Sequence, residues 1–213
     1  MAVVDRTKYM SADEVRQLRT VTEARAIVDL KAGRVNGALG WMVVDIALST
    51  GLRVSEIAKL HVEDIDLKRG LVTVNRAKKR KRVKPEPLAI GRDLADHLRD
   101  FLAWRAGRIT DLQEPVRAGL VATKGALFIG CRGPLTAQGL QRVWKAAIKR
   151  ASLPAELSIH SARHTLAVHL LRKTGNLRQV QKQLGHSSPT ITAALYADVT
   201  FEDMQAGVTG LYA

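Results

Sequence analysis

The sequence predicts a mainly α-helical domain with a small antiparallel β-sheet, an α+β fold. Helical signals dominate, because apolar residues recur at helical spacing behind capping residues such as Ser11, Thr136 and Asn176. Strand signals are confined to the alternating stretch 71–74 and the short segment 126–129. With 213 residues, 46% of them hydrophobic, and no internal repeat, the chain fits one domain with a proper core.

The two ends of the chain carry weaker signals than its middle. Residues 1–8 have no hydrophobic period, so we expect them to be disordered and the domain to occupy residues 9–213. A short last helix is expected from about residue 200 to 207. The tail 199–213 has few residues with which to pack, so it is a candidate for docking on a neighbouring subunit.

Three helices are expected before residue 50. Ser11 and Glu14 form a capping box that starts the first helix, and a second is expected through Ile27 and Leu30. Residues 36–49 predict a buried helix that ends at a threonine followed by Gly51, since glycine commonly occupies the position after a helix.

Arg53 follows that glycine in the stretch T-G-L-R-V-S-E-I. Ser55 is expected to cap a short helix through Leu60, which leaves Arg53 in a turn beside a helix N-terminus, where phosphate binds readily. The alternative is that Arg53 only makes a surface ion pair with Glu56 or Asp64.

A cluster of positive charge follows the predicted strand 71–74. Its seven basic residues are Arg76, Lys78, Lys79, Arg80, Lys81, Arg82 and Lys84. Because an apolar strand precedes the cluster and P-E-P-L-A-I follows it, we expect the tip of a β-hairpin that contacts a phosphate backbone. The alternative is a solvated, mobile run of charge.

The second half of the chain is predicted to be helical with a basic exterior. An amphipathic helix is expected from Arg92 to Arg105, a loop over 106–125, and a helix from Thr136 to about Ala151. The outer face of this last helix carries basic residues, of which Arg142 and Lys145 are candidate DNA contacts. The next helix is expected to hold His160 and to run to about residue 173. It is followed by a helix capped by Asn176 and a short helix from residue 189 that displays Tyr196.

Composition points to a polyanionic partner. There are 34 Lys and Arg against 20 Asp and Glu, a net charge of +14, so nucleic acid is the first candidate and an anionic membrane surface the second. No apolar run approaches the roughly 20 residues that span a bilayer. The single cysteine, Cys131, excludes an internal disulfide and favours a reducing cytoplasm. We interpret Cys131 as the end of a strand rather than a nucleophile.

The region from His160 to Tyr196 offers the groups that phosphoryl transfer to a side chain requires. His160 and Arg163 stand three residues apart on one helix face, and His186 and Tyr196 follow after a turn. A forked guanidinium matches phosphate, histidines exchange protons, and a phenol can act as nucleophile. The rival phenols, Tyr9 and Tyr212, lie near the chain ends.

A zinc site is the structural alternative for this region. His160 and His164 have the spacing of a metalloprotease ligand pair, but Ser161 and Ala162 stand where such a helix carries its glutamate. We therefore expect His164 and His169 to be packing residues.

Three stretches, T-G-L-R-V-S-E-I, H-S-A-R-H-T and L-G-H-S-S…Y, resemble the signature boxes of the tyrosine recombinase family, the phage-integrase-like site-specific DNA recombinases. The resemblance runs from about Tyr9 to the end of the chain, in the family's order. It implies the fold of the family's catalytic domain and double-stranded DNA as partner. It also implies a homo-oligomer, a tetramer on DNA, with a monomer away from DNA as the alternative.

The resemblance also implies a mechanism. The Tyr196 hydroxyl would attack a DNA phosphodiester to form a 3′-phosphotyrosyl bond, and a 5′-hydroxyl would later rejoin the strand, without metal or ATP. Arg53 and Arg163 would hold the phosphate, His160 would take or relay the tyrosine proton, and His186 would bond to the phosphate. Counting from the R-x-K-P-E-P-L end of the hairpin favours Lys78 as the lysine that protonates the leaving oxygen, ahead of Lys79 and Lys81.

Three features depart from the family pattern. The interval from His186 to Tyr196 is one residue longer than usual, and the hairpin lacks a glycine-lysine-glycine tip. An N-terminal core-binding domain, which usually closes a DNA clamp, is missing from this sequence, so the chain is expected to be a catalytic fragment or a small stand-alone member. Two functional alternatives remain: a type IB topoisomerase, which relaxes DNA without pairing sites, and a catalytically idle DNA-binding regulator of the same fold.

Overall fold

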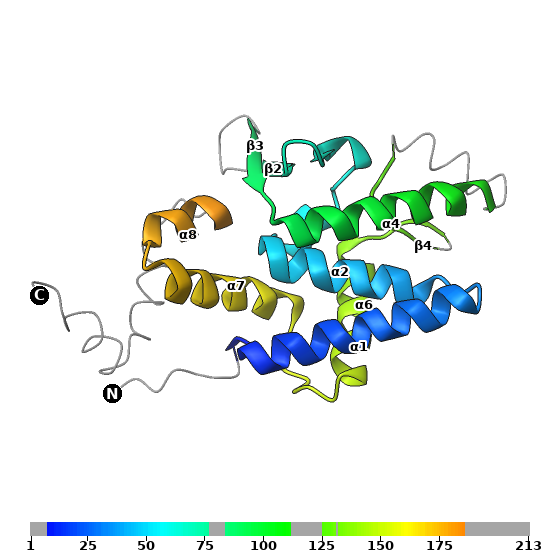
Figure 1. The fold of residues 1–213 in the computed structure, drawn as a ribbon, viewed down its shortest axis with the longest axis horizontal. Coiled ribbons are helices and arrows are strands. Elements are labelled where there is room, and N and C mark those ends of the chain that lie inside the picture. Colours follow the sequence, from blue (N-terminus) through cyan, green and yellow to red (C-terminus); the bar gives the residue numbers. More distant parts are fainter. Residues whose placement is uncertain (1–7, 77–83, 112–124, 131, 186–213) are drawn as a thin grey trace, which may run out of the picture.

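A computed structural model describes residues 8–76, 84–111, 125–130 and 132–185. Over these residues the chain is mostly helical and carries small antiparallel sheets, as predicted (Figure 1). The helices are α1 (Ala12–Lys31), α2 (Asn36–Thr50), α3 (Val54–Ile57), α4 (Arg92–Asp111), α6 (Ala137–Arg150), α7 (Ile159–Thr174) and α8 (Leu177–Leu184). The strands are β1 (Ile65–Asp66), β2 (Leu71–Arg76), β3 (Lys84–Ala89), β4 (Ile129–Gly130) and β5 (Gly133–Pro134).

Helix α1 begins as predicted and then continues further than predicted. The Ser11 hydroxyl accepts from the Glu14 N–H at 3.2 Å, and the Glu14 carboxylate accepts from the Ser11 N–H at 2.7 Å, which completes the capping box. The prediction of a second helix through Ile27 and Leu30 is wrong, because α1 is continuous from residue 12 to 31. No glycine or proline interrupts this stretch, so nothing in the sequence breaks the helix.

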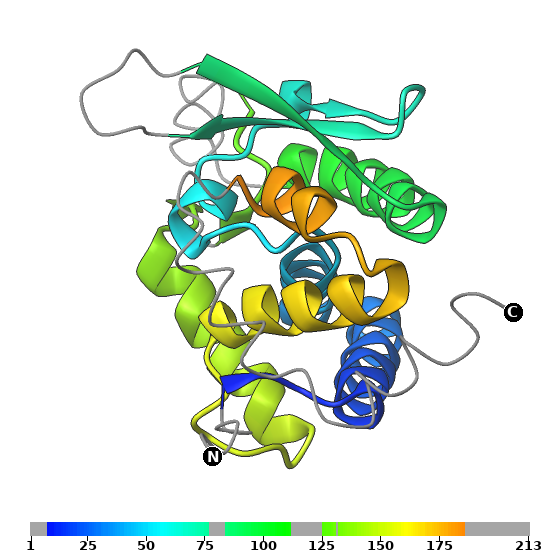
Figure 2. The same ribbon diagram turned by 90° about the vertical axis from the view of Figure 1, so that its left-hand side faces the viewer.

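Helix α2 is the centre of the fold. It packs against α1, α4, α6 and α7, and it is apolar nearly all round, as a fully enclosed helix must be (Figures 1 and 2). Its one buried carboxylate, Asp45, pairs with Arg19 of α1 at 2.9 Å and with Nδ1 of His97 of α4 at 2.8 Å. The predicted end of α2 is confirmed, since Gly51 follows Thr50 with a φ of +63°.

The basic hairpin is built on β2 and β3. These strands pair antiparallel from Leu71 with Ala89 to Arg76 with Lys84, and β1 adds on the other side of β2. Because β3 is an edge strand, it accommodates Pro85 and Pro87, which a central strand would not. The predicted hairpin strands are therefore confirmed, whereas its tip, residues 77–83, lies outside the described residues.

The segment 126–129 does not join this hairpin, contrary to the prediction of one small sheet. Its end pairs with β5 in a separate two-stranded sheet. The Leu127 N–H donates to the Leu60 carbonyl at 2.8 Å, and the Arg105 guanidinium donates to the Ala126 carbonyl at 2.6 Å. These bonds tie the segment to the end of α3 and to α4. Helix α4 itself extends to Asp111, so the predicted loop over 106–125 begins later than expected.

The last described helices have the predicted caps. The Thr136 hydroxyl accepts from the Gly139 N–H at the start of α6, and Asn176 caps α8. Gly175 and Gly185 end α7 and α8 with φ values of +61° and +63°. A small apolar cluster joins α7 to α8 beside the main core. Among the described residues, no helix combines the length and apolar character that crossing a bilayer requires.

Some sequence predictions fall where the structure describes nothing. These are the disordered segment up to residue 7, the strand end at Cys131, the helix that displays Tyr196 and the tail 199–213.

Candidate phosphate-binding site

Arg53 lies where the sequence places it, in the turn between α2 and α3. Helix α3 begins one residue after it, so Arg53 is the N-cap, and the prediction of Ser55 as cap with a helix through Leu60 is wrong. Glu56 causes this difference: its carboxylate accepts from the Arg53 N–H and from Nη1 of Arg53, both at 2.8 Å.

The ion pair between Arg53 and Glu56 is not a surface feature. The Glu56 side chain is 8% exposed and that of Arg53 43% exposed. The buried Glu56 carboxylate therefore holds the Arg53 guanidinium in place, while the Arg53 side chain still reaches the surface. The ion pair was the alternative to a phosphate-binding role for Arg53, but the two are compatible, because the pair leaves the Arg53 side chain partly exposed.

Arg163, on α7, is almost fully buried, with 3% of its surface exposed. Its Nη1 donates to the Gly51 carbonyl and its Nη2 to the Leu184 carbonyl, each at 2.6 Å. The guanidinium of Arg163, a residue of α7, thus joins the end of α2 to the end of α8. Because Gly51 lies two residues before Arg53, the same turn positions both arginines.

Gly51 is required at this turn for two reasons. Its φ of +63° is unfavourable for residues with a Cβ, and a Cβ here would lie 2.6 Å from Cδ2 of Leu184 and 2.9 Å from Cδ2 of Leu166. The sequence predicted the glycine as the end of a helix. Its second role, the close approach of α7 and α8 to this turn, has no local sequence signal.

His160 stands one helical turn before Arg163 and is exposed at the N-terminus of α7. Partial burial lowers its pKa below the usual 6.5, and the positive charges of Arg163 and then Arg53 lower it further. The imidazole is therefore neutral at pH 7 and able to accept a proton. Its ring meets that of His164 edge to face, with centroids 4.8 Å apart.

A pocket of about 410 Å³ brings Arg53 and His160 together. It is lined by Arg53, Val54, Ser55, Gln141, Trp144, Lys145, Ser158, Ile159 and His160. The N-terminus of the 16-residue α7 faces this pocket, and helix N-termini favour anions. Two cationic side chains, a neutral imidazole and a helix N-terminus are what a phosphodiester-binding site needs. We name these nine residues the phosphate pocket.

Trp144 forms the buried part of the wall of the phosphate pocket. The ring is fully buried, and its Nε1 donates to the Leu157 carbonyl at 2.8 Å. This bond fixes the turn that leads into Ser158 and His160, so α6 positions the start of α7.

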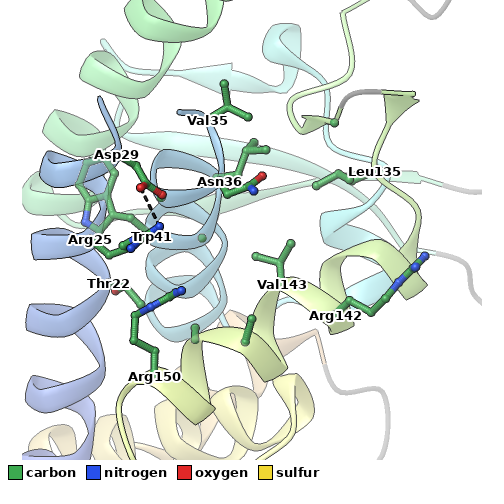
Figure 3. A pocket seen from close by; sticks show the side chains of 16 residues that line it. Thr22, Arg25, Asp29, Val35, Asn36, Trp41, Leu135, Arg142, Val143 and Arg150 are labelled. Atoms are coloured by element: carbon green, nitrogen blue, oxygen red, sulfur yellow. Dashed lines mark ion pairs between the residues drawn. The ribbon is translucent and has the colours of Figure 1, made fainter. Parts of the chain in front are cut away.

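The two residues predicted on α6 to contact DNA, Arg142 and Lys145, are both exposed and line different pockets. Lys145 lines the phosphate pocket, whereas Arg142 lines a different pocket of about 440 Å³ between α1, α2 and α6 (Figure 3). That second pocket also holds Arg150 and the ion pair of Arg25 with Asp29.

The structure does not describe several predicted site residues. The predicted catalytic residues Lys78, His186 and Tyr196 and the predicted DNA contacts Lys79, Arg80, Lys81 and Arg82 lie outside the described residues. For Arg76 and Lys84 it describes only the backbone, which forms the last pair of the hairpin ladder. Within the described residues, no three His, Cys, Asp or Glu side chains are grouped to hold a metal ion.

The sequence matches the phage integrase family over residues 8–203. Tyrosine recombinase XerC of Pelotomaculum thermopropionicum is 33% identical over 158 residues, which are 73% of this chain and 48% of the relative. Tyrosine recombinase XerD of Ralstonia nicotianae is 33% identical over 94% of this chain and 65% of the relative. The chain thus spans about half to two thirds of the length of these relatives.

Solved structures share the fold. The Tn1549 transposon integrase in complex with transposon right end DNA superposes with a TM-score of 0.73 at 19% identity, over 97% of this chain and 67% of that one. XerA recombinase superposes with a TM-score of 0.69 at 22% identity, over 93% and 63% of the two chains. The predicted fold class is confirmed. Together with the sequence match over most of its length, this shows that the chain belongs to the phage integrase family.

Proposed function

We propose that this chain is a site-specific DNA strand-transferase that cleaves and rejoins DNA through a phosphotyrosyl bond at Tyr196. The observation that carries the proposal is the phosphate pocket, in which Arg53 and His160 meet at the N-terminus of α7. Arg163 does not line this pocket; it lies buried one helical turn after His160 and is bonded to the Gly51 carbonyl of the turn that holds Arg53. Relatives named tyrosine recombinase and a XerH site-specific recombinase bound to its difH substrate support DNA as the substrate.

The first chemical step forms one bond and breaks one. The Tyr196 oxygen attacks the phosphorus, the bond to the 5′-oxygen breaks, and the DNA 3′ end remains attached through phosphate to the tyrosine. His160, neutral because of its lowered pKa, takes the phenolic proton. Lys78 gives a proton to the departing 5′-oxygen. Reversal by a 5′-hydroxyl restores the phosphodiester, so the bond energy is conserved.

Arg53 stabilises the negative charge that grows on the nonbridging oxygens. A guanidinium is suited to this because its planar fork matches two phosphate oxygens. Arg163, whose Nη1 and Nη2 donate to the Gly51 and Leu184 carbonyls, adds a positive charge close to His160. We assign His186 a hydrogen bond to the same phosphate; in the sequence it follows by two residues Leu184, whose carbonyl accepts from Arg163. Removing one donor of this type typically lowers a rate by about 10²- to 10³-fold.

The remaining contacts position the duplex. We assign phosphate contacts to Lys145 of the phosphate pocket and to the hairpin residues Arg76, Lys79, Arg80, Lys81, Arg82 and Lys84. We also assign one to Arg142, further along α6. Residues 9–213 form the catalytic unit, which acts on DNA as a homo-oligomer, a tetramer, in the cytoplasm.

The experiment is a covalent trapping assay. A nicked duplex whose cleaved strand loses a short 5′-hydroxyl fragment prevents rejoining, so a protein–DNA adduct that survives denaturation should accumulate. Tyr196→Phe should abolish the adduct, and Tyr212→Phe, the matched control, should not. Salt-sensitive DNA binding without an adduct would contradict the proposal and favour an idle DNA-binding regulator.

The assignment of the lysine has its own test. A 5′-bridging sulfur leaves as a thiolate and needs no proton, so it should restore cleavage to Lys78→Ala. Lys79→Ala and Lys81→Ala should cleave the ordinary substrate. If Lys79→Ala or Lys81→Ala is the variant that needs the sulfur, the general acid is that lysine instead.

A further inference from the structure

The outward face of α1 carries an apolar patch that nothing in the described part of the chain covers. Of the described residues, Ile27, Val28 and Leu30 are the large hydrophobic side chains that stay exposed, at 51%, 53% and 45%. The opposite face of α1, with Leu18 and Ala26, packs against α2. Because three exposed apolar residues within one turn are unusual at a free surface, the patch indicates a contact site.

Two residues of the patch, Ile27 and Leu30, belong to a longer stripe with a regular pattern, and Val28 lies beside it. Exposed residues at helical spacing form this stripe: Thr20, Glu23, Ala24, Ile27, Leu30 and Lys31. We call these six residues the α1 stripe. Neither Glu23 nor Lys31 has an ion pair among the described residues.

The α1 stripe is complementary to itself. Two copies of α1 can pair antiparallel with Ile27 at the centre. In this register, residue 27 + n of one copy lies level with residue 27 − n of the other. Lys31 is then level with Glu23 of the second copy, and Leu30 is level with the small side chain of Ala24. Opposite charges and unequal sizes thus meet on both sides of the Ile27 contact, as an isologous interface requires.

We propose that the α1 stripe binds the α1 stripe of a second copy of this chain, across a two-fold axis near Ile27. A carboxylate at Glu23 argues against DNA as the occupant, because it would repel a phosphate backbone. The stripe lies on the exposed face of a helix, which argues against a small ligand, since such ligands bind in concave sites. This interaction holds whether or not Tyr196 cleaves DNA.

The contact is small, so it is weak. Three partly exposed apolar side chains per copy cover far less than the roughly 800 Å² per partner of a stable complex. We expect self-association with a dissociation constant on the order of 100 μM. Two copies brought close together on one DNA molecule would pair far more readily, because their effective concentration is then about millimolar.

Sedimentation of the whole chain over a range of concentrations provides the test. Glu23→Lys places Lys opposite Lys31, and Lys31→Glu places Glu opposite Glu23, so each should weaken dimerisation about tenfold. The double variant exchanges both charges and should restore it. All substituted positions are exposed, so unchanged melting temperatures should show that the fold is intact.

A cross-link gives an independent readout. With Cys131 replaced by serine, Ile27→Cys should form a symmetric disulfide dimer under mild oxidation, since the two residues face each other at the axis. Ala103→Cys, at an exposed position of α4, is the matched control and should remain monomeric.

Three results would overturn the proposal. The first is a monomer at every concentration. The second is a double variant that associates no better than its parents, which would show that Glu23 and Lys31 do not face each other across a two-fold axis. The third is equal cross-linking at positions 27 and 103.

Discussion

Replacing Gly51 with alanine should destabilise the protein more than the same change at Gly175. Both glycines follow long helices and have left-handed φ values, +63° and +61°. They differ in their surroundings, because a Cβ on Gly51 would lie 2.6 Å from the Leu184 side chain, whereas a Cβ on Gly175 has nothing within 4 Å. The pair therefore separates backbone strain from close packing.

The magnitudes follow from these two effects. A left-handed conformation costs a residue with a Cβ about 1–2 kcal/mol, which both variants should lose. Overpacking a core adds about 1–3 kcal/mol at Gly51 alone, because Leu184 is buried and cannot move freely. Gly51→Ala should thus lower the free energy of unfolding by about 2–5 kcal/mol, against about 1–2 kcal/mol for Gly175→Ala.

Urea unfolding at equilibrium measures both values under the same conditions. The trapping assay adds a functional comparison, because the Gly51 carbonyl accepts from Arg163 and any shift of that turn displaces the guanidinium. Under conditions where both variants are folded, Gly51→Ala should form adduct more slowly than Gly175→Ala. Equal losses of stability, within about 0.5 kcal/mol, would refute the close approach of α7 and α8 to this turn.

Three further predictions concern buried or coupled charges. Arg163→Lys should lower the rate of adduct formation about 10²- to 10³-fold with less effect on DNA affinity, because a lysine cannot donate to both the Gly51 and the Leu184 carbonyl in the same geometry. An unchanged rate in single-turnover assays would contradict a role of Arg163 in strand cleavage. The His160 imidazole should titrate by NMR with a midpoint below pH 6.5, because its pKa is lowered in the folded state. Its contribution to stability is therefore complete above pH 6.5 and is lost as the pH falls through the lowered pKa. A midpoint at or above pH 6.5 would be inconsistent with the site. Asp45→Ala should lower the free energy of unfolding by about 2–4 kcal/mol, because it removes the buried carboxylate to which Arg19 and His97 bind; a loss below about 0.5 kcal/mol in urea unfolding would argue against this network.

The sequence was most informative where local chemistry decides the structure. Capping residues such as Ser11, Thr136 and Asn176 marked true helix starts, because a side-chain bond to the helix backbone depends only on neighbours along the chain. The glycines 51, 175 and 185 marked true ends for a similar reason. The hairpin strands were also predictable from the alternation of residues 71–74 and the turn before them.

Tertiary contacts explain what the sequence did not predict. The segment 126–129 is held away from the hairpin by bonds such as that of Arg105 to the Ala126 carbonyl, which joins residues 21 positions apart. The burial of Arg163 depends on the Gly51 carbonyl, 112 positions away. Such pairs leave no periodic signal, so their presence could be expected only from the family resemblance.

The candidate site shows the same division. The motifs around Arg53 and His160 correctly suggested that the two residues share one site, and they line one pocket. The motif around Arg53 also contains Glu56, but its burial, which makes it a support for Arg53, appears only in the structure. Arg142 and Lys145 are three residues apart on α6, and only the structure shows that the two exposed side chains line different pockets.

The most direct test of the proposed chemistry is to identify the protein atom that becomes attached to DNA. The trapped adduct should be digested with nuclease and protease, and the modified peptide sequenced by mass spectrometry. The peptide that contains Tyr196 should carry a nucleotide through a 3′-phosphate on the phenol, and this signal should fall sharply in Arg53→Ala and Arg163→Lys. A nucleotide on any other side chain, or a signal unaffected by both arginine substitutions, would contradict the assignment of the phosphate pocket as the site of strand cleavage.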